Sequence, residues 1–397
     1  MTYIHKMALL DFLFKKQTQI TPIEPKKDET PYVLSLNFGT SVYPTISEPK
    51  NKEYVYFGED NLYPDELINM FNNCSINQSI ITQKSKMISG GGYTYDDNNL
   101  SDIQKAEMEK MLRFIDNEHS IDDFINLIAG DWELFGAMAI EVIWSRDFSR
   151  ITSYKRVKPS YIRSGKKEEG KVKTYYYSQN WASVKNYPPI AIPAFDINDN
   201  KHYTQLMYFK KYNPSTEYYG IPGYASAMNY IQSDIQIAQY HNNNISNGFA
   251  PGLVINFTKK PNSQEERDII VGELKKQYQG ARNAGKPLIF FSDGAENRTL
   301  IEQVGASDLD KQFDILHRQI VEQICSAHRL TSTELMGIAI PGRLGNSNIE
   351  TAYNIFEATV IKPERDYISK VINDLFKING LFINFQLKPL NILVSNG

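Results

Sequence analysis

The chain has 397 residues, with 43 Lys and Arg against 46 Asp and Glu, which gives a formal net charge of −3. It is long enough to bury a sizeable core, but it lacks the bulk positive charge of a protein that grips DNA tightly. Two cysteines far apart, Cys74 and Cys325, argue against a disulfide framework, and no apolar run approaches the ~20 residues that cross a bilayer.

The first part of the chain combines an extended arm with a helical segment. Residues 17–31, QTQITPIEPKKDETP, have the proline content and mixed charge of an arm or linker, which we assign to 1–31. Pro64 then opens a helical pattern that continues to the glycine triplet 90–92, with a break expected at Cys74-Ser75. Because these glycines follow a helix and no Gly-Lys-Ser/Thr is present, they indicate a flexible helix end rather than a nucleotide cradle.

Helices and strands then alternate as expected for an α+β body over 32–220. The patterns predict helices over Ser101–Asn117 and Ile121–Gly136, with Ser120 and Asp123 as a capping box for the second. Residues Ala137–Trp144 read as an apolar strand. Alternating polar and apolar residues predict three further strands, with a hairpin turn over 164–170 between the first two: Ile151–Arg163, Lys171–Gln179 and Tyr203–Asn213.

Two long amphipathic helices are predicted next, over 221–250 and 306–329. Gly220 and Pro222 precede the first helix, and Asn247-Gly248 and Pro251 end it. Between the two helices, 251–305 predicts a compact β-α-β-β unit. Its elements are the strand Leu253–Phe257, the helix Ser263–Gln279 and the strands Pro287–Phe291 and Arg298–Val304.

The last part of the chain begins with a glycine-containing loop, 330–347, and continues as a helix over 348–378. Ser347 and Glu350 form a capping box for this helix, and Pro363 should kink it. Leu381–Leu387 reads as one strand within 379–397. The helix residues predicted to face inward are Ile349, Ala352, Tyr353, Phe356, Val360, Pro363, Tyr367, Val371 and Leu375.

Several of these patterns together resemble tailed-bacteriophage portal proteins, over roughly Tyr54 to Leu387. They are YFGEDNLYPDEL, NQSIITQKSKMISGGG, and the unit of Tyr-Gly-x-Pro, amphipathic helix, Asn-Gly-Phe-Ala-Pro-Gly and apolar strand. The resemblance implies a portal-type α+β fold. Its expected parts are an α+β wing (32–220), two stem helices (221–250 and 306–329), a small α/β clip (251–305), a tunnel loop (330–347), a kinked wing helix (348–378) and a C-terminal strand with a reduced crown (379–397).

The resemblance also implies a function as a ring, usually of twelve subunits, at the capsid vertex of a virion. Double-stranded DNA would be packaged and ejected through this ring without sequence-specific contacts. The implied partners are the terminase large subunit, the major capsid and scaffolding proteins and the neck or adaptor proteins, with assembly in the cytoplasm of the bacterial host. No membrane partner, cofactor, metal or enzymatic activity is expected.

Three sets of residues are the candidate functional positions. The apolar stripes of the stem helices are expected to meet neighbouring subunits: Met228, Ile231, Ile235, Phe313, Ile320 and Ile324. Basic residues of the clip are expected to face the motor or neck: Lys259, Lys260, Arg267, Lys275, Lys276 and Arg282. The DNA-facing residues of the tunnel loop are expected to be Ile338, Pro341, Gly342, Arg343, Leu344, Gly345 and Asn346.

Other functions have weaker support in the sequence. His317, Cys325 and His328 form a stripe on one helix, but the two histidines lie eleven residues, roughly 16 Å, apart, so helix packing is favoured over a shared metal ion. No motif for nucleophilic or metal-assisted hydrolysis is present. The alternative is a soluble α+β enzyme or scaffold with an aromatic-lined pocket in 150–220, and the mass in solution would distinguish it from a ring.

Overall fold

A computed structural model describes residues 43–113, 119–246, 307–338 and 349–390, and three strands between the second and third of these ranges. The predicted arm, 1–31, lies outside the described residues. None of the helices described is long and apolar enough to cross a membrane. The helices are α2 (Tyr63–Asn73), α3 (Ser75–Ser89), α4 (Asp102–Arg113), α5 (Ile121–Phe135), α6 (Met228–Ser246), α8 (Ser307–Ala327), α9 (Ile349–Phe356) and α10 (Lys362–Ile378).

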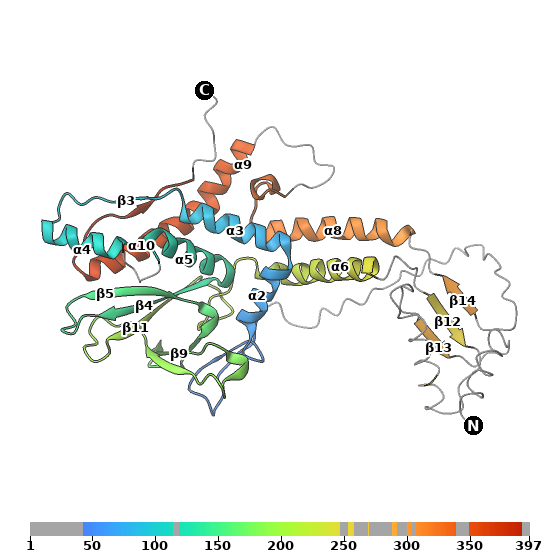
Figure 1. Ribbon diagram of the computed structural model, residues 1–397, viewed down its shortest axis with the longest axis horizontal. Coiled ribbons are helices and arrows are strands. Elements are labelled where there is room, and N and C mark those ends of the chain that lie inside the picture. The colour runs from blue at the N-terminus through green and yellow to red at the C-terminus, as the bar shows by residue number, and fades with distance from the viewer. Residues whose placement is uncertain are drawn as a thin grey trace. The chain divides into compact units, whose positions relative to one another are not determined.

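The strands are short, apart from three that form the central antiparallel sheet in the order β11-β4-β5. These three are β4 (Ala137–Trp144), β5 (Ile151–Val157) and β11 (Thr204–Lys210), and α5 packs on β4 (Figure 1). The other strands are β1 (Ile46–Ser47), β2 (Tyr56–Phe57), β3 (Tyr93–Thr94), β6 (Ile162–Ser164), β7 (Lys167–Glu168), β8 (Lys171–Val172), β9 (Thr174–Tyr177), β10 (Ile190–Pro193), β12 (Leu253–Phe257), β13 (Leu288–Phe291), β14 (Leu300–Gln303) and β15 (Gln386–Leu387).

The predicted strand Ile151–Arg163 is in fact two strands. β5 ends at Val157, a 3₁₀ turn covers Pro159–Tyr161, and β6 joins a different sheet by pairing with β9. Pro159 explains the break, because proline has no N–H to donate to a ladder. The predicted turn 164–170 is also tighter than expected, since β7 pairs with β8 and leaves only Glu169 and Gly170 at the tip, both with positive φ.

The glycine triplet ends α3 as expected, but close packing explains it better than flexibility. The N–H of Gly91 donates to the carbonyl of Lys388 at 2.9 Å. A Cβ on Gly90, whose φ is +76°, would lie 2.0 Å from the same carbonyl oxygen. The last described segment of the chain therefore lies directly on these glycines, which corrects the prediction of a flexible helix end. The predicted break at Cys74 is confirmed, because Cys74 separates α2 from α3.

A second place where two backbone segments pack closely lies between the end of α5 and the segment before α6. The capping box of Ser120 and Asp123 begins α5 as predicted, and Gly136 ends it with φ +66°. A Cβ on Gly136 would lie 2.3 Å from the carbonyl oxygen of Ile221, and one on Gly220 would lie 2.1 Å from that of Gly136. Only glycine at both positions lets the two backbones cross at this distance.

The helix predicted over 348–378 is α9, a π-helical turn over Glu357–Ile361 and α10, in that order. Ile349 is 46% exposed and Pro363 is also exposed, so neither faces inward as predicted. The π turn holds one residue more than an α turn and therefore shifts the buried face of α10. That face consists of Arg365, Ile368, Ser369, Val371, Ile372, Leu375 and Phe376.

The segment 381–387 alternates buried and exposed residues as the strand prediction requires, but only Gln386 and Leu387 pair, with β3. In the unit between the long helices, β12 lies between β13, which is parallel to it, and β14, which is antiparallel. These three strands agree with the predicted ones. Of the predicted helix Ser263–Gln279 only Ile269 is described, as a helical and exposed residue.

Candidate functional site: the root of the long helices

The long helices α6 and α8 lie side by side and antiparallel (Figure 1). Two contacts set their register. Nε2 of His317 lies 3.2 Å from Oδ1 of Asp234, and the rings of His328 and Tyr224 stack at 4.7 Å. The polypeptide therefore leaves the body just after Tyr224 and returns to it at His328, and we call this place the root.

The apolar stripes of these helices are covered by their own chain. Met228, Ile231, Ile320 and Ile324 are all buried in the core, while Ile235 is half-buried against it. For the four buried residues, the argument that a neighbouring subunit must cover the stripe is therefore wrong. The physical reason is that α2 packs on α6 and α3 packs on α8, so each helix has more than one partner within the chain. Phe313 belongs to α8, but its side chain lies outside the described residues.

Where the side chains of α6 and α8 are described, over 228–239 and 316–327, the surface left to solvent is mainly polar. On this part of α8 the exposed side chains are His317, Arg318, Gln319, Glu322, Gln323 and Ser326. On α6 they include Tyr230, Gln232, Gln236 and Gln239. A partner that meets these faces would therefore find amides, hydroxyls and scattered charges rather than an apolar stripe.

A buried charge cluster lies at the root, and the sequence had not indicated it. The carboxylate of Glu133, on α5, lies 2.5 Å from Nζ of Lys84 on α3 and 2.7 Å from Nζ of Lys211, which follows β11. Lys211 also pairs with Glu364 of α10 at 3.1 Å, and Nε1 of Trp132 donates to Glu364 at 2.5 Å. Burial alone would raise the pKa of Glu133, but Lys211 and Lys84 outweigh burial and lower it well below its ordinary value.

His328 is the second buried polar group of the root. Its Nε2 lies 2.9 Å from Oδ1 of Asn77 on α3, and its side chain is almost fully buried. Burial, reinforced by the nearby charge of Lys84, lowers the pKa of His328 well below its ordinary value, so the ring is neutral. Nδ1 of His328 and Nδ2 of Asn77 have no hydrogen-bond partner within the part of the chain that the structure describes.

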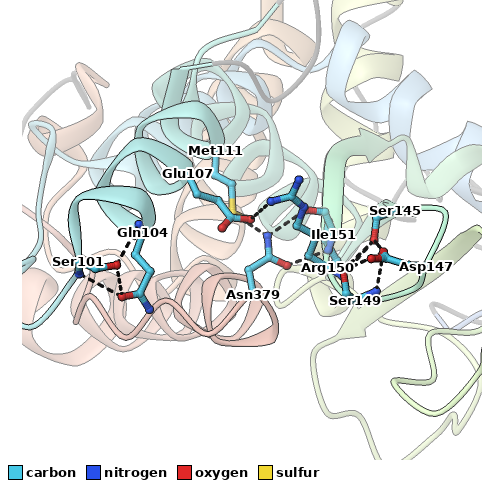
Figure 2. Close-up of polar contacts among 10 residues, drawn as sticks. All are labelled: Ser101, Gln104, Glu107, Met111, Ser145, Asp147, Ser149, Arg150, Ile151 and Asn379. Carbon is cyan, nitrogen blue, oxygen red and sulfur yellow. Dashed lines mark hydrogen bonds and ion pairs between the residues drawn. The ribbon is translucent and has the colours of Figure 1, made fainter.

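A third polar group, shown in Figure 2, joins the far end of α10 to the body. The side-chain amide of Asn379 accepts from the N–H of Ile151 at 2.8 Å and donates to its carbonyl at 2.9 Å. The same amide lies 3.2 Å from the sulfur of Met111, and Arg150 pairs with Glu107 of α4 at 3.4 Å. These contacts fasten α4, the turn between β4 and β5 and the end of α10 together, which is a structural task.

Several aromatic residues of 150–220 pack against one another and against neighbouring aromatics, while Tyr187 and Tyr212 are exposed. Trp181 meets Tyr54 at 4.9 Å, and Tyr175 meets Tyr208 at 5.4 Å. The fully buried guanidinium of Arg163 stacks on Trp181 and donates to Oδ1 of Asn61 at 2.7 Å. The aromatic side chains thus form packed core around a buried arginine, as their strand pattern suggested.

The remaining candidate residues divide into those described and those that are not. The two histidines of the stripe for which helix packing was favoured contact different groups, Asp234 and Asn77. Among the described residues no cluster of three or more His, Cys, Asp or Glu could hold a metal ion. Ile338 packs half-buried on the core, and its N–H donates to the carbonyl of Thr333 at 3.1 Å, so it is anchored to the body at the start of the predicted tunnel loop. Lys259, Lys260, Arg267, Lys275, Lys276 and Arg282, and also Pro341, Gly342, Arg343, Leu344, Gly345 and Asn346, lie outside the described residues.

The start of the predicted tunnel loop is ordered. A 3₁₀ turn covers Thr333–Met336, with Ser332 as its N-cap, and Met336 is buried. The hydroxyl of Ser79 on α3 donates to the carbonyl of Met336 at 3.0 Å. The part of 330–347 available as a loop is therefore shorter than the sequence suggested and begins after Ile338.

The described chain is thus a body of helices and short sheets that holds an antiparallel helix pair at a charged, buried root. The chain belongs to the phage portal protein family, whose pattern matches residues 91–393. The fold that was expected from the sequence, mixed α and β of the portal type, is thereby confirmed.

Solved structures of similar fold include two necks of gene transfer agent particles. The neck of the empty particle, computed with C6 symmetry, has a TM-score of 0.57 at 16% identity and covers 84% of this chain and 85% of that one. The neck of the native particle, computed with C12 symmetry, has a TM-score of 0.54 at 16% identity, with 83% and 85% covered. An HK97-family phage portal protein from Corynebacterium diphtheriae has a TM-score of 0.50 at 10% identity, with 81% and 95% covered. No curated protein matches the chain.

Proposed function

We propose that copies of this chain form the portal ring at the capsid vertex of a virion, through which double-stranded DNA is packaged and ejected. The observation that supports the proposal is the family match over 91–393. This range includes both long helices, the three strands that lie between them in the sequence, and much of the body. The similar gene transfer agent necks were computed with C6 and C12 symmetry, which supports a ring of about twelve copies.

The subunit contact of such a ring is heterologous, because one face of each copy meets a different face of the next. Since four residues of the stripes, Met228, Ile231, Ile320 and Ile324, are buried within the chain, the described part of the stem contributes its polar faces to this contact. Polar contacts of this kind favour specificity and register over raw affinity. Assembly should therefore depend on salt more than a contact between apolar stripes would.

The finer assignments belong to the same proposal. The 251–305 unit serves as the clip, where its basic residues meet the terminase large subunit during packaging and the neck or adaptor proteins afterwards. The loop that begins after Ile338 reaches the DNA, and Arg343 touches phosphates loosely enough for the duplex to slide. Scaffolding and major capsid proteins are the partners during assembly in the host cytoplasm.

The proposal is tested by the mass and shape of the assembled protein. Light scattering and negative-stain microscopy of the purified chain, alone and mixed with scaffolding and capsid proteins, should find closed rings of about twelve copies. The same samples across a range of salt concentrations would test whether the contact is polar. Monomers under every condition would contradict the ring and favour the alternative of a soluble enzyme or scaffold.

A further inference from the structure

Two histidines, His317 in α8 and His328 in the turn directly after it, contact different parts of the molecule. His317 lies beside a carboxylate, Asp234 of α6, whereas His328 lies beside a neutral amide, Asn77 of α3. The first contact joins the two long helices to each other. The second joins the end of α8 to the body. His328 therefore lies at the attachment of α8, away from the contact between His317 and Asp234.

Every element packed around His328 contributes to its charge environment. Lys84 of α3 and Lys211, after β11, are the nearby cations, and Glu133 of α5 is bonded to both. Tyr224, before α6, stacks on the ring, and Glu364 of α10 is already shared by Lys211 and Trp132. Both carboxylates of the root are thus already paired with lysines, and neither is left over to neutralise a charge on His328. A proton on His328 adds a third buried positive charge, and its described hydrogen-bond partner, the Asn77 amide, carries no negative charge.

The contact between α6 and α8 does not involve His328. His317 lies 3.2 Å from Asp234, which also accepts a hydrogen bond from the thiol of Cys74 at 3.2 Å. The two long helices also pack directly on each other, so their pairing does not depend on the bond between His328 and Asn77.

We infer that His328 is a proton-sensitive lock at the root of the long helices, whose protonation loosens the attachment of α8 to α3 while α6 and α8 stay paired. The end of α8 then moves more freely on α3, while α6 keeps its contact with α2. This property belongs to the single chain. It would hold whether or not the proposed ring forms.

Hydrogen–deuterium exchange of the whole protein at pH 7.5 and pH 5.5, corrected for intrinsic amide rates, measures the lock. Peptides covering 75–84 and 320–330 should exchange about tenfold faster at pH 5.5, because an opened histidine with its ordinary pKa of 6.5 is about ten-elevenths protonated there. Peptides from β4, at the centre of the sheet, should not change, which separates local opening from global unfolding.

Three variants test the assignment to His328. His328→Gln cannot titrate and should abolish the pH response of the root, while His317→Gln, within α8 and not in contact with Asn77, should leave it intact. Asn77→Asp places a carboxylate beside His328 and should reduce or reverse the increase in exchange at pH 5.5. This variant also tests the lock if His328→Gln fails to fold. Equal corrected exchange at both pH values in the wild-type protein would overturn the lock. An undiminished response in both His328→Gln and Asn77→Asp would also overturn it.

Discussion

Glu133 is the residue on which most of the buried charge at the root depends, since Lys84 and Lys211 both pair with it. Glu133→Gln leaves Lys84 buried without a carboxylate, and removing one partner of a buried pair costs about 3–5 kcal/mol. We therefore expect the free energy of unfolding of Glu133→Gln, measured in urea, to be lower than that of the wild type by about 3–5 kcal/mol. Glu217→Gln, which removes an exposed partner of Lys167, is the matched control and should leave the urea midpoint essentially unchanged.

The same carboxylate predicts how stability depends on pH. The pKa of Glu133 in the folded chain lies well below its ordinary value of 4.5. As the pH falls below 4.5 the unfolded chain binds a proton that the folded chain does not, so this contribution is present above pH 4.5 and lost below it. Urea titrations between pH 6 and pH 3 should show a steeper loss of stability in the wild-type protein than in Glu133→Gln. Parallel curves would show that Glu133 is not the group responsible.

Glycine is required where two backbones cross, and this gives a second prediction at the residue scale. Gly220→Ala would place a Cβ 2.1 Å from the carbonyl oxygen of Gly136, so the backbones must separate, at a cost of about 2 kcal/mol or more. Gly130→Ala is the control, because nothing lies within 4 Å of its Cβ and the residue is inside α5. It should stabilise the protein by about 0.5–1 kcal/mol. Thermal or urea unfolding of the pair gives the comparison.

At the scale of elements, the π turn between α9 and α10 predicts an unequal response to deletion. The N–H of Lys362 bonds the carbonyl of Glu357, five residues earlier, so deleting the exposed Ala358 should restore a regular α-helix and keep both buried faces. We expect a loss of less than about 2 kcal/mol. Deleting the exposed Lys370 instead turns the rest of α10 by about 100° and removes Val371 and Leu375 from the core. That variant should not fold, and equal stability of the two would contradict the explanation.

At the scale of the whole molecule, the proposed channel predicts that assembly and DNA handling can be separated. Deleting residues 339–345 removes Arg343 but spares Ile338, which packs on the core. Rings should form as in the wild type, because the described parts of the body and helices are untouched, while less DNA is packaged or retained. Microscopy of the rings and the DNA content of filled particles measure the two effects. Normal filling would remove this segment from the proposed path of the DNA.

The proposed clip predicts a complementary phenotype. Lys275→Glu combined with Lys276→Glu reverses two charges that we propose face an acidic motor surface, and such changes mainly affect the rate and specificity of association. Motor binding and packaging should fall while rings still assemble. Lys171→Glu, at the exposed β7–β8 hairpin, is a control that changes charge elsewhere. Unchanged motor binding in the double variant would exclude these two lysines from the interface.

Periodicity and local chemistry determined much of this protein from the sequence alone. The break at Cys74, the capping box at Ser120, strand β4 and the two long helices all follow from signals within a few residues of one another, and the quoted motifs identified the family. Such elements form because capping, helix propensity and side-chain alternation act over one or two turns.

Only the tertiary structure decided which partners those elements meet. The ion pairs of Glu133, the bond of His328 to Asn77 and the crossing at Gly136 and Gly220 join residues about 50 to 250 positions apart. The same holds for the apolar stripes, since an amphipathic pattern shows that a face is buried but does not show against what. Here α2 and α3 bury those stripes within the chain, because the fold places both helices beside the root.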